Sequence, residues 1–233
     1  MITIIGVGHV FDISRPLEKV ILERNPSVVC VELDPMRYQS LMHPGGRKDM
    51  PLPYRMLARL QERIAKKYGT QVGREMITAI ETAKTLNAKL AFIDMDSSKT
   101  VSSFFKSMSR REKIKFVFAL LSSFFVSKKR IEKELEKFEE GEEDYIEMFG
   151  REFPAAKRMI IDDRNRYMAS AIKKINQEYE NIVAVVGDGH VEGIRTLLEP
   201  MDLEIIRLSQ LRKAQPEKVD EVTVSYTVSY DYY

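Results

Sequence analysis

The chain has 233 residues, of which 44% are hydrophobic, so it can bury one sizeable core. Its 37 basic and 35 acidic residues give a net charge of +2, which supplies no overall field for nucleic acid or an acidic membrane. Its single cysteine, Cys30, excludes an internal disulfide, and Met1 to Gly6 lack the pattern of a secretory signal. We therefore expect a cytoplasmic protein with one α/β domain over residues 1–233 and no nucleic-acid partner.

Short runs of β-branched residues alternate with helical patterns along the chain. The runs are Ile2 to Val7, Ser27 to Leu33, Ala88 to Asp94, Asn181 to Val186 and Leu203 to Leu208. Between the first two runs, Ser14 is the expected N-cap of an amphipathic helix that Asn25 ends. The alternation predicts a mostly parallel or mixed sheet flanked by helices.

Further helices are expected from Pro53 to Lys67 and from Gln71 to Leu86. From Val101 to Gly150 basic, apolar and acidic stretches follow one another, and we interpret residues 101–150 as a helical insertion within the domain. A long helix resumes near Pro154 and reaches Glu180.

Two apolar features indicate contacts beyond the core. Residues 114–126 hold an apolar run flanked by lysines that falls short of the ~20 residues of a membrane span. A buried or partner-covered helix is the favoured interpretation, and peripheral contact with a membrane surface is the alternative. Residues 219–233 alternate as a C-terminal edge strand, and because an exposed edge invites pairing we expect a homodimer through this strand or the apolar helix.

Polar residues cluster where the predicted strands end. His9, Glu32, Asp94 and His190 each follow a strand, and in an open parallel sheet the carboxyl ends of the strands form the ligand crevice. A right-handed crossover places the first two strands in one sheet with their carboxyl ends on the same side. We therefore expect His9 and Glu32 to be near neighbours.

The motif Gly-x-x-His occurs twice, at Gly6 to His9 and at Gly187 to His190. With Glu32, and Asp94 as a further candidate, the two histidines would suit zinc, manganese, cobalt or iron. The metal-free alternative makes one histidine a general base oriented by a carboxylate. Each histidine taken alone could be a structural turn residue, but the repetition favours one shared site.

A second group of charged residues lies on the predicted long helix. Asp163, Arg166 and Tyr167 fall on one helix face, whereas Arg164 points elsewhere. An arginine in this segment could clamp a carboxylate or stabilise an oxyanion, and a solvated charged face is the alternative. The same two interpretations apply to Arg74.

Several short segments, taken in order, resemble the TraB/PrgY family, within the wider group of GumN, the Tiki proteases and the erythromycin-esterase/ChaN-like proteins. The segments are Gly6 to Val10, Pro26 to Tyr38, Gly73 to Met76, Asp163 to Met168 and Val185 to Val191. The resemblance implies an α/β core with two Gly-x-x-His motifs and an acidic residue at the site. It also implies a metal-dependent peptidase activity for the Tiki branch, and inactivation or sequestration of peptide pheromones for TraB and PrgY.

Carried over by position, the resemblance makes His9, Glu32 and His190 candidate metal ligands or catalytic groups. It makes Arg164 a candidate contact to the substrate or to an oxyanion. The candidate substrate-binding residues are Arg37, Tyr38, Arg74, Asp94 and Asp163.

The leading expectation is a metal-dependent hydrolase, plausibly a peptidase, whose metal-bound hydroxide attacks a carbonyl of a peptide or small molecule. Two alternatives stay open. One is a non-catalytic protein that binds or sequesters a peptide or small ligand, and the other is a metal-independent hydrolase of the esterase type.

Overall fold

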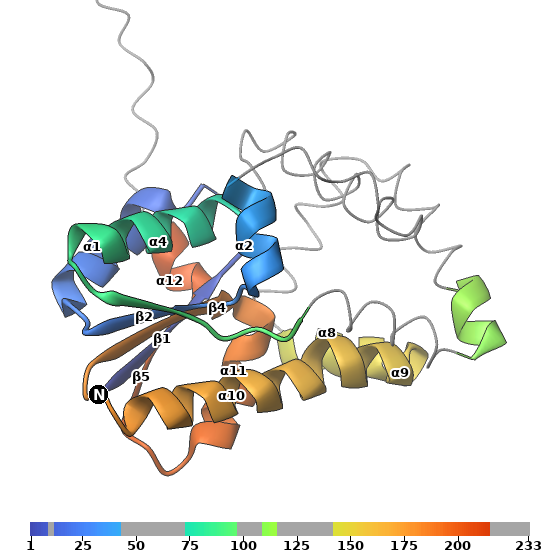
Figure 1. Ribbon diagram of the computed structural model, residues 1–233. Helices are drawn as coiled ribbons and strands as arrows, with labels where there is room; N and C mark the ends of the chain where they lie inside the picture. The colour runs from blue at the N-terminus through green and yellow to red at the C-terminus, as the bar shows by residue number, and fades with distance from the viewer. Residues whose placement is uncertain (9–11, 43–72, 97–108, 116–141, 215–233) are drawn as a thin grey trace, which may run out of the picture.

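One sheet of five parallel strands forms the centre of the computed structural model, which describes residues 1–8, 12–42, 73–96, 109–115 and 142–214 (Figure 1). The strand order is β3-β2-β4-β1-β5. The strands are β1 (Ile2–Val7), β2 (Val28–Val31), β3 (Lys89–Phe92), β4 (Ile182–Gly187) and β5 (Leu203–Ile206). The predicted α/β class is confirmed, and every strand pair is parallel.

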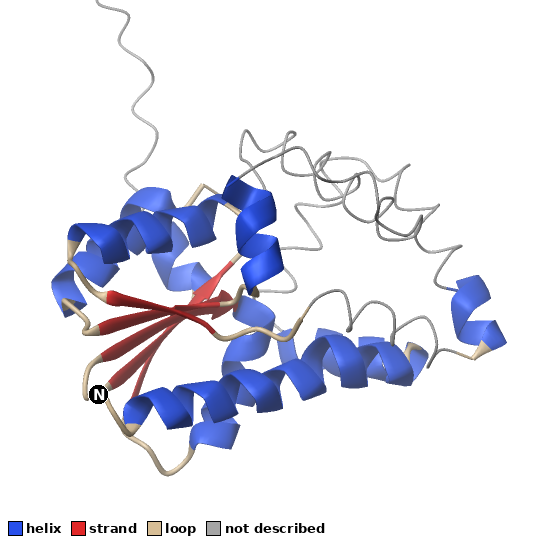
Figure 2. Ribbon diagram, in the orientation of Figure 1, coloured by secondary structure: helices blue, strands red, loops and turns tan. Residues whose placement is uncertain are grey.

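Helices cover both faces of this sheet (Figure 2). One face carries α1 (Ser14–Arg24), α4 (Arg74–Thr85) and α12 (Leu208–Lys213), and the other carries α10 (Asp163–Asn176) and α11 (Asp188–Leu198). The helix α2 (Pro35–Met42) follows β2. The molecule therefore has three layers, as expected for a parallel sheet that must bury both faces.

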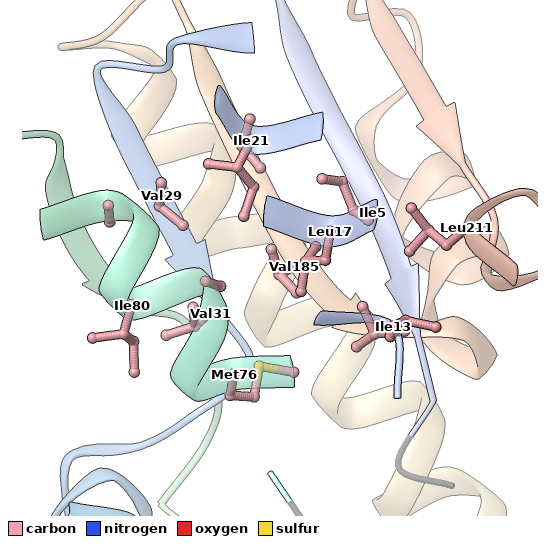
Figure 3. Packing of buried hydrophobic residues seen from close by; sticks show 14 of the residues in the cluster. Ile5, Ile13, Leu17, Ile21, Val29, Val31, Met76, Ile80, Val185 and Leu211 are labelled. Carbon is pink, nitrogen blue, oxygen red and sulfur yellow. The ribbon is translucent and has the colours of Figure 1, made fainter. Parts of the chain in front are cut away.

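Two apolar clusters hold the layers together because successive strand residues point to opposite faces. Figure 3 shows the first cluster, in which Ile5, Val31 and Val185 pack against Leu17 of α1 and Met76 of α4. The second cluster packs the other sheet face against α10 and α11, with Ile4, Cys30, Ala184, Met168, Ile172 and Ile194 among its members. Burial raises the pKa of the Cys30 thiol to about 12, as expected for an inert core cysteine.

Strand β4 lies between β1 and β2, so these two strands are not adjacent. The expected proximity of His9 and Glu32 stays a prediction, because His9 lies outside the described residues. The crossover rule fixes the handedness of the connection and the direction of the strands, but not which strands are neighbours, and β4 lies between β1 and β2. The backbone N–H of Glu32 donates to the carbonyl of Val185 at 3.1 Å. Glu32 therefore extends from β2 alongside β4, the strand that leads to His190.

The two ends of α1 differ in how well they match the prediction. Ser14 is the first helical residue and not the N-cap, and its buried Oγ has no hydrogen-bond partner. Asp12 accepts the Ser14 N–H instead, at 3.3 Å. At the other end, Asn25 adopts the left-handed conformation and donates its N–H to Ile21, which ends the helix as predicted.

The predicted long helix from Pro154 is interrupted. It consists of α9 (Pro154–Lys157), the π-helical turn η2 (Arg158–Asp162) and α10, which ends at Asn176. It is preceded by α8 (Glu142–Glu152). A π turn inserts an extra residue and rotates the helix face that follows, and such turns are frequent at functional sites.

Several predicted features lie outside the described residues. They are the helix from 53 to 67, the apolar run from 116 to 126 and the tail strand from 219 to 233, so the dimer predicted through them stays a prediction. The helix predicted from Gln71 is described from Arg74 onwards as α4. Among the helices that the structure describes, none combines the length and apolar character that crossing a bilayer would need.

Strand β1 can pack closely against α11 because Gly6 has no side chain. A Cβ there would lie 3.0 Å from Asp188 Cγ and 3.0 Å from Val191 Cγ2, and would overlap Asp188 Oδ1. That oxygen accepts the Leu208 N–H at 2.9 Å and Arg207 Nε at 3.1 Å. Gly6 therefore lets Asp188 tie the start of α11 to the start of α12.

We predict that Gly6→Ala lowers the free energy of unfolding by about 1–3 kcal/mol, because the added methyl group displaces Asp188 from its donors. Urea denaturation measures the change. Gly150→Ala is the control, since its added Cβ meets only the flexible side chain of Lys157, and it should change stability by less than about 0.5 kcal/mol. Equal losses in the two variants would contradict this account of Gly6.

Candidate functional site

Four polar side chains that are distant in sequence meet at the carboxyl end of the sheet. Glu32 follows β2 directly, Asp94 lies two residues beyond β3, and His190 sits in the first turn of α11 after β4. Arg164 comes from the first turn of α10. Glu32, Asp94 and His190 are buried, and the Arg164 side chain is 15% exposed.

Arg164 joins the other three, and each of its five N–H groups has an acceptor. Nε donates to Asp94 Oδ1 at 2.9 Å, and Nη2 donates to Asp94 Oδ2 at 2.8 Å and to Glu32 Oε1. Nη1 contacts His190 Nε2 at 3.1 Å and donates to the Ile160 carbonyl at 3.4 Å. Since a guanidinium has five donors and no acceptor, its hydrogen-bonding capacity is fully used.

A second arginine reaches the same network from α2. The Oδ1 atom of Asp34 accepts the N–H groups of Met36 at 2.8 Å and Arg37 at 3.0 Å, which caps the start of α2. Arg37 then donates from Nη1 to Asp94 Oδ2 at 3.0 Å. Two carboxylates are thereby balanced by two guanidinium groups, which offsets the cost of burying charge.

Glu32 is held as an anion. Its Oε2 accepts the Gly187 N–H at 2.6 Å, and its Oε1 accepts Arg164. Burial alone would raise its pKa, but three groups outweigh burial and lower the pKa of Glu32 to about 2: His190, once it is protonated at low pH, the Arg164 guanidinium and the Gly187 N–H. Burial opposes the charge of Arg164 in turn, but Glu32 and Asp94 raise its pKa above the ordinary arginine value.

His190 is oriented from both sides of its ring. Nδ1 lies 2.7 Å from Asn165 Oδ1, while Nε2 lies 3.1 Å from Arg164 Nη1 and 3.6 Å from Glu32 Oε1. Because Arg164 can only donate, Nε2 must be the acceptor in that contact, and the ring hydrogen then belongs on Nδ1. The geometry therefore assigns a neutral imidazole whose Nδ1–H donates to Asn165.

His9 lies outside the described residues, so its meeting with His190 stays a prediction. The strand β1 ends at Val7, two residues before His9, and Val7 is paired with Gly187. Both Gly-x-x-His segments thus leave the sheet from neighbouring strands at the same edge.

The remaining candidate residues lie apart from the Arg164 network. Tyr38 packs its ring against Phe92 with the ring centroids 5.0 Å apart, as part of the core. Arg74 is exposed at the start of α4. Asp163 pairs with Arg166, which is 57% exposed, on the outer side of α10. The structure therefore brings together Glu32, Asp94, His190, Arg164 and Arg37, but not these three.

Sequence reasoning missed Asn165 and the backbone N–H of Gly187. Asn165 is buried and touches His190, yet nothing in its residue type distinguished it from its neighbours. Its position directly after Arg164, inside one of the segments quoted above, was the signal available.

The comparisons with known proteins agree with the family resemblance of the sequence. The model of the TraB/PrgY/gumN family matches residues 1–205. The chain belongs to this family. It is also 30% identical to the uncharacterized protein MJ1365 of Methanocaldococcus jannaschii, in an alignment that covers 91% of this chain and 58% of that relative. The chain thus spans somewhat more than half the length of that curated relative.

A metal site in this TraB/PrgY/gumN protein can be tested against the described donors. The 3.6 Å between His190 Nε2 and Glu32 Oε1 is close to the ~3.4 Å that separates two ligands of a tetrahedral ion with bonds of ~2.1 Å. However, Arg164 contacts both atoms, and a divalent ion there would lie against its positive charge. No cluster of three His, Cys, Asp or Glu side chains suited to a metal occurs among the described residues, which do not include His9. The distance between His190 Nε2 and Glu32 Oε1 therefore suits a metal ion, but the positive charge of Arg164 beside both atoms does not.

Arg164→Ala should lower the free energy of unfolding of this TraB/PrgY/gumN protein by about 3–5 kcal/mol, because Glu32 and Asp94 would be left buried without their main counter-charge. The matched control is Arg166→Ala, two residues along the same helix. Its ion pair with Asp163 is largely exposed and should contribute no more than about 0.5 kcal/mol. Urea denaturation of both variants measures the contrast, and similar losses would refute the central role of Arg164.

Proposed function

We propose that this chain is a metal-independent hydrolase of carbonyl compounds such as peptides, with His190 as its general base. One observation carries the proposal. The unprotonated Nε2 of His190 lies between opposite charges, 3.1 Å from Arg164 Nη1 and 3.6 Å from Glu32 Oε1. When such a base takes a proton, the anion beside it stabilises the imidazolium, and the cation stabilises the negative charge that forms on the substrate oxygen.

Arg164 can respond to a substrate because one of its donors is loosely used. Its Nη1 divides its hydrogens between His190 Nε2 and the Ile160 carbonyl, and the latter contact is the longest of the five, at 3.4 Å. A substrate carbonyl oxygen entering beside Nη1 would accept the hydrogen that now faces Nε2, while the other hydrogen stays with the Ile160 carbonyl. That exchange would free the lone pair of Nε2 for a water molecule.

The proposed reaction then needs only groups of this chain and water. Nε2 takes a proton from water, the resulting hydroxide adds to the carbonyl carbon, and Arg164 stabilises the negative charge on the carbonyl oxygen. When the tetrahedral intermediate collapses, the imidazolium returns the proton to the leaving amine or alkoxide. Glu32, an anion at neutral pH and 3.6 Å from Nε2, stabilises the imidazolium in between.

A metal-dependent hydrolase is the second candidate, favoured by the spacing of His190 Nε2 and Glu32 Oε1. In that case His9, Glu32 and His190 would hold a divalent ion, which would supply an activated water when bound. Arg164 would first have to leave both atoms that it now contacts.

Hydrolysis by the full chain is expected to persist after dialysis against EDTA, with fluorogenic peptides and p-nitrophenyl esters as probes. His190→Gln should lower kcat/KM by about 100-fold or more, because it removes the base. Arg164→Lys keeps a charge but not the five-donor arrangement, and a loss of about 100-fold is expected for it. Arg166→Lys, on the exposed side of α10, is the matched control and should be unchanged.

Two results would overturn the proposal. Activity that EDTA abolishes and manganese, zinc or cobalt restores would establish the metal-dependent candidate instead. Saturable binding of the peptides without turnover, with or without added metal, would indicate a binding or sequestering protein.

A further inference from the structure

The side of His190 that faces away from Arg164 contacts Asn165. Asn165 belongs to α10 and His190 to α11, two helices that pack against each other. Asn165 is 5% exposed, and its Oδ1 lies 2.7 Å from Nδ1 of the imidazole. A buried amide at this distance is a fixed acceptor and not a passing surface contact.

Arg164 and Asn165 are consecutive residues, yet they hold opposite nitrogens of the same ring. Neighbouring residues of an α-helix point about 100° apart, so an imidazole that wedges between them can be contacted by both. The π turn η2 ends at Asp162, two residues before Arg164. It sets the rotation of α10 at the point where the helix meets His190.

Gly193 leaves the space that Asn165 occupies. It lies one turn after His190 on the same face of α11. A Cβ at this position would lie 3.0 Å from Asn165 Cγ and would overlap its Nδ2. Glycine inside a helix is less stable than alanine, so the close approach of Asn165 supplies the reason for a glycine here.

From this geometry we infer that Asn165 and Gly193 form a positioning pair that keeps the ring hydrogen of His190 on Nδ1 and leaves Nε2 as the acceptor. Gly193 makes the room, and Asn165 supplies the acceptor oxygen. Which nitrogen of a histidine carries the hydrogen is set by the bond that the other nitrogen makes. Without the Asn165 acceptor, the Nδ1–H group would be buried without a partner, and only the Arg164 contact would still favour it. Part of the population would then carry the hydrogen on Nε2, and in that form Nε2 could not take a proton from water. The consequence for hydrolysis rests on the proposed function, but the tautomer itself does not.

The test is the tautomer of His190 in the full chain labelled with ¹⁵N-histidine, read from two-bond ¹H–¹⁵N correlations. The chain has three histidines, and His190→Gln identifies the signal. The wild-type protein should show one tautomer, with hydrogen on Nδ1. Asn165→Leu, of similar size but with no acceptor, should shift part of the population to hydrogen on Nε2, because only Arg164 then opposes that form, and Asn165→Asp should keep the hydrogen on Nδ1.

Gly193→Ala provides an independent variant that leaves both polar residues in place. It should behave as Asn165→Leu does, because the added methyl group displaces the amide. Thr196→Ala, at an exposed position of the same helix, should leave the wild-type tautomer. Where a probe is hydrolysed, Asn165→Leu should lower kcat by about 10–100-fold with little change in KM, and Asn165→Asp should recover part of the loss.

A wild-type His190 with hydrogen on Nε2 would overturn the inference at once, whether or not any variant folds. So would an Nδ1–H population that stays at the wild-type level in folded Gly193→Ala or Asn165→Leu. An Nδ1–H population that falls in both variants supports the positioning pair even if no hydrolysis is detected. In that case the failure would belong to the proposed function alone.

Discussion

Glu32 and Asp94 are buried at the carboxyl end of this sheet, and neither would stay ionised there without a cation at hand. Arg164 supplies it, reaching Asp94 with two parallel hydrogen bonds and Glu32 with one. Its remaining donors extend to His190 and to its own helix. This one guanidinium therefore connects residues that follow three strands with residues of two helices. Because all five of its N–H groups have acceptors, its position is fixed.

The strand order explains why these groups meet. Because β4 lies between β1 and β2, the turn after β4 places the Gly187 N–H against Glu32 and starts α11 beside it. Glu32 and His190 thus follow two neighbouring inner strands of the sheet, β2 and β4, and Asp94 follows the edge strand β3 beside them. Arg37 enters from α2 and is the more exposed of the two arginines, with 33% of its side chain accessible.

Some of this arrangement could be predicted from the sequence, and the reasons differ from part to part. The strands were predictable because β-branched runs between helical patterns are local signals, and Glu32, Asp94 and His190 followed because they stand where strands end. Adjacency of strands is not local, so the entry of β4 beside β2 could not be predicted. Ser14 failed as a cap because Pro16, two residues on, has no N–H, and the Leu17 N–H already bonds the Ile13 carbonyl at 3.0 Å, so the helix includes Ser14.

The contacts made by α10 were the hardest part to predict. Helical periodicity separates Arg164 from Asp163 and Arg166, but only tertiary packing shows that Arg164 turns inwards and that their ion pair lies at the surface. The π turn before Arg164 rotates the helix that follows it relative to a regular α-helix. A period of 3.6 residues therefore does not predict which side of α10 faces the site. The close approach of Asn165 to Gly193 could not be predicted, because it depends on how α10 packs against α11.

The direct test of the account is a double-mutant cycle between Arg164 and Glu32, residues 132 positions apart in the chain. Arg164→Met, Glu32→Gln and the combined variant would be compared with the wild-type protein by urea denaturation. The buried pair predicts a coupling free energy of about 2 kcal/mol or more. Losses that simply add, with a coupling near zero, would contradict the claim that Arg164 organises this end of the sheet.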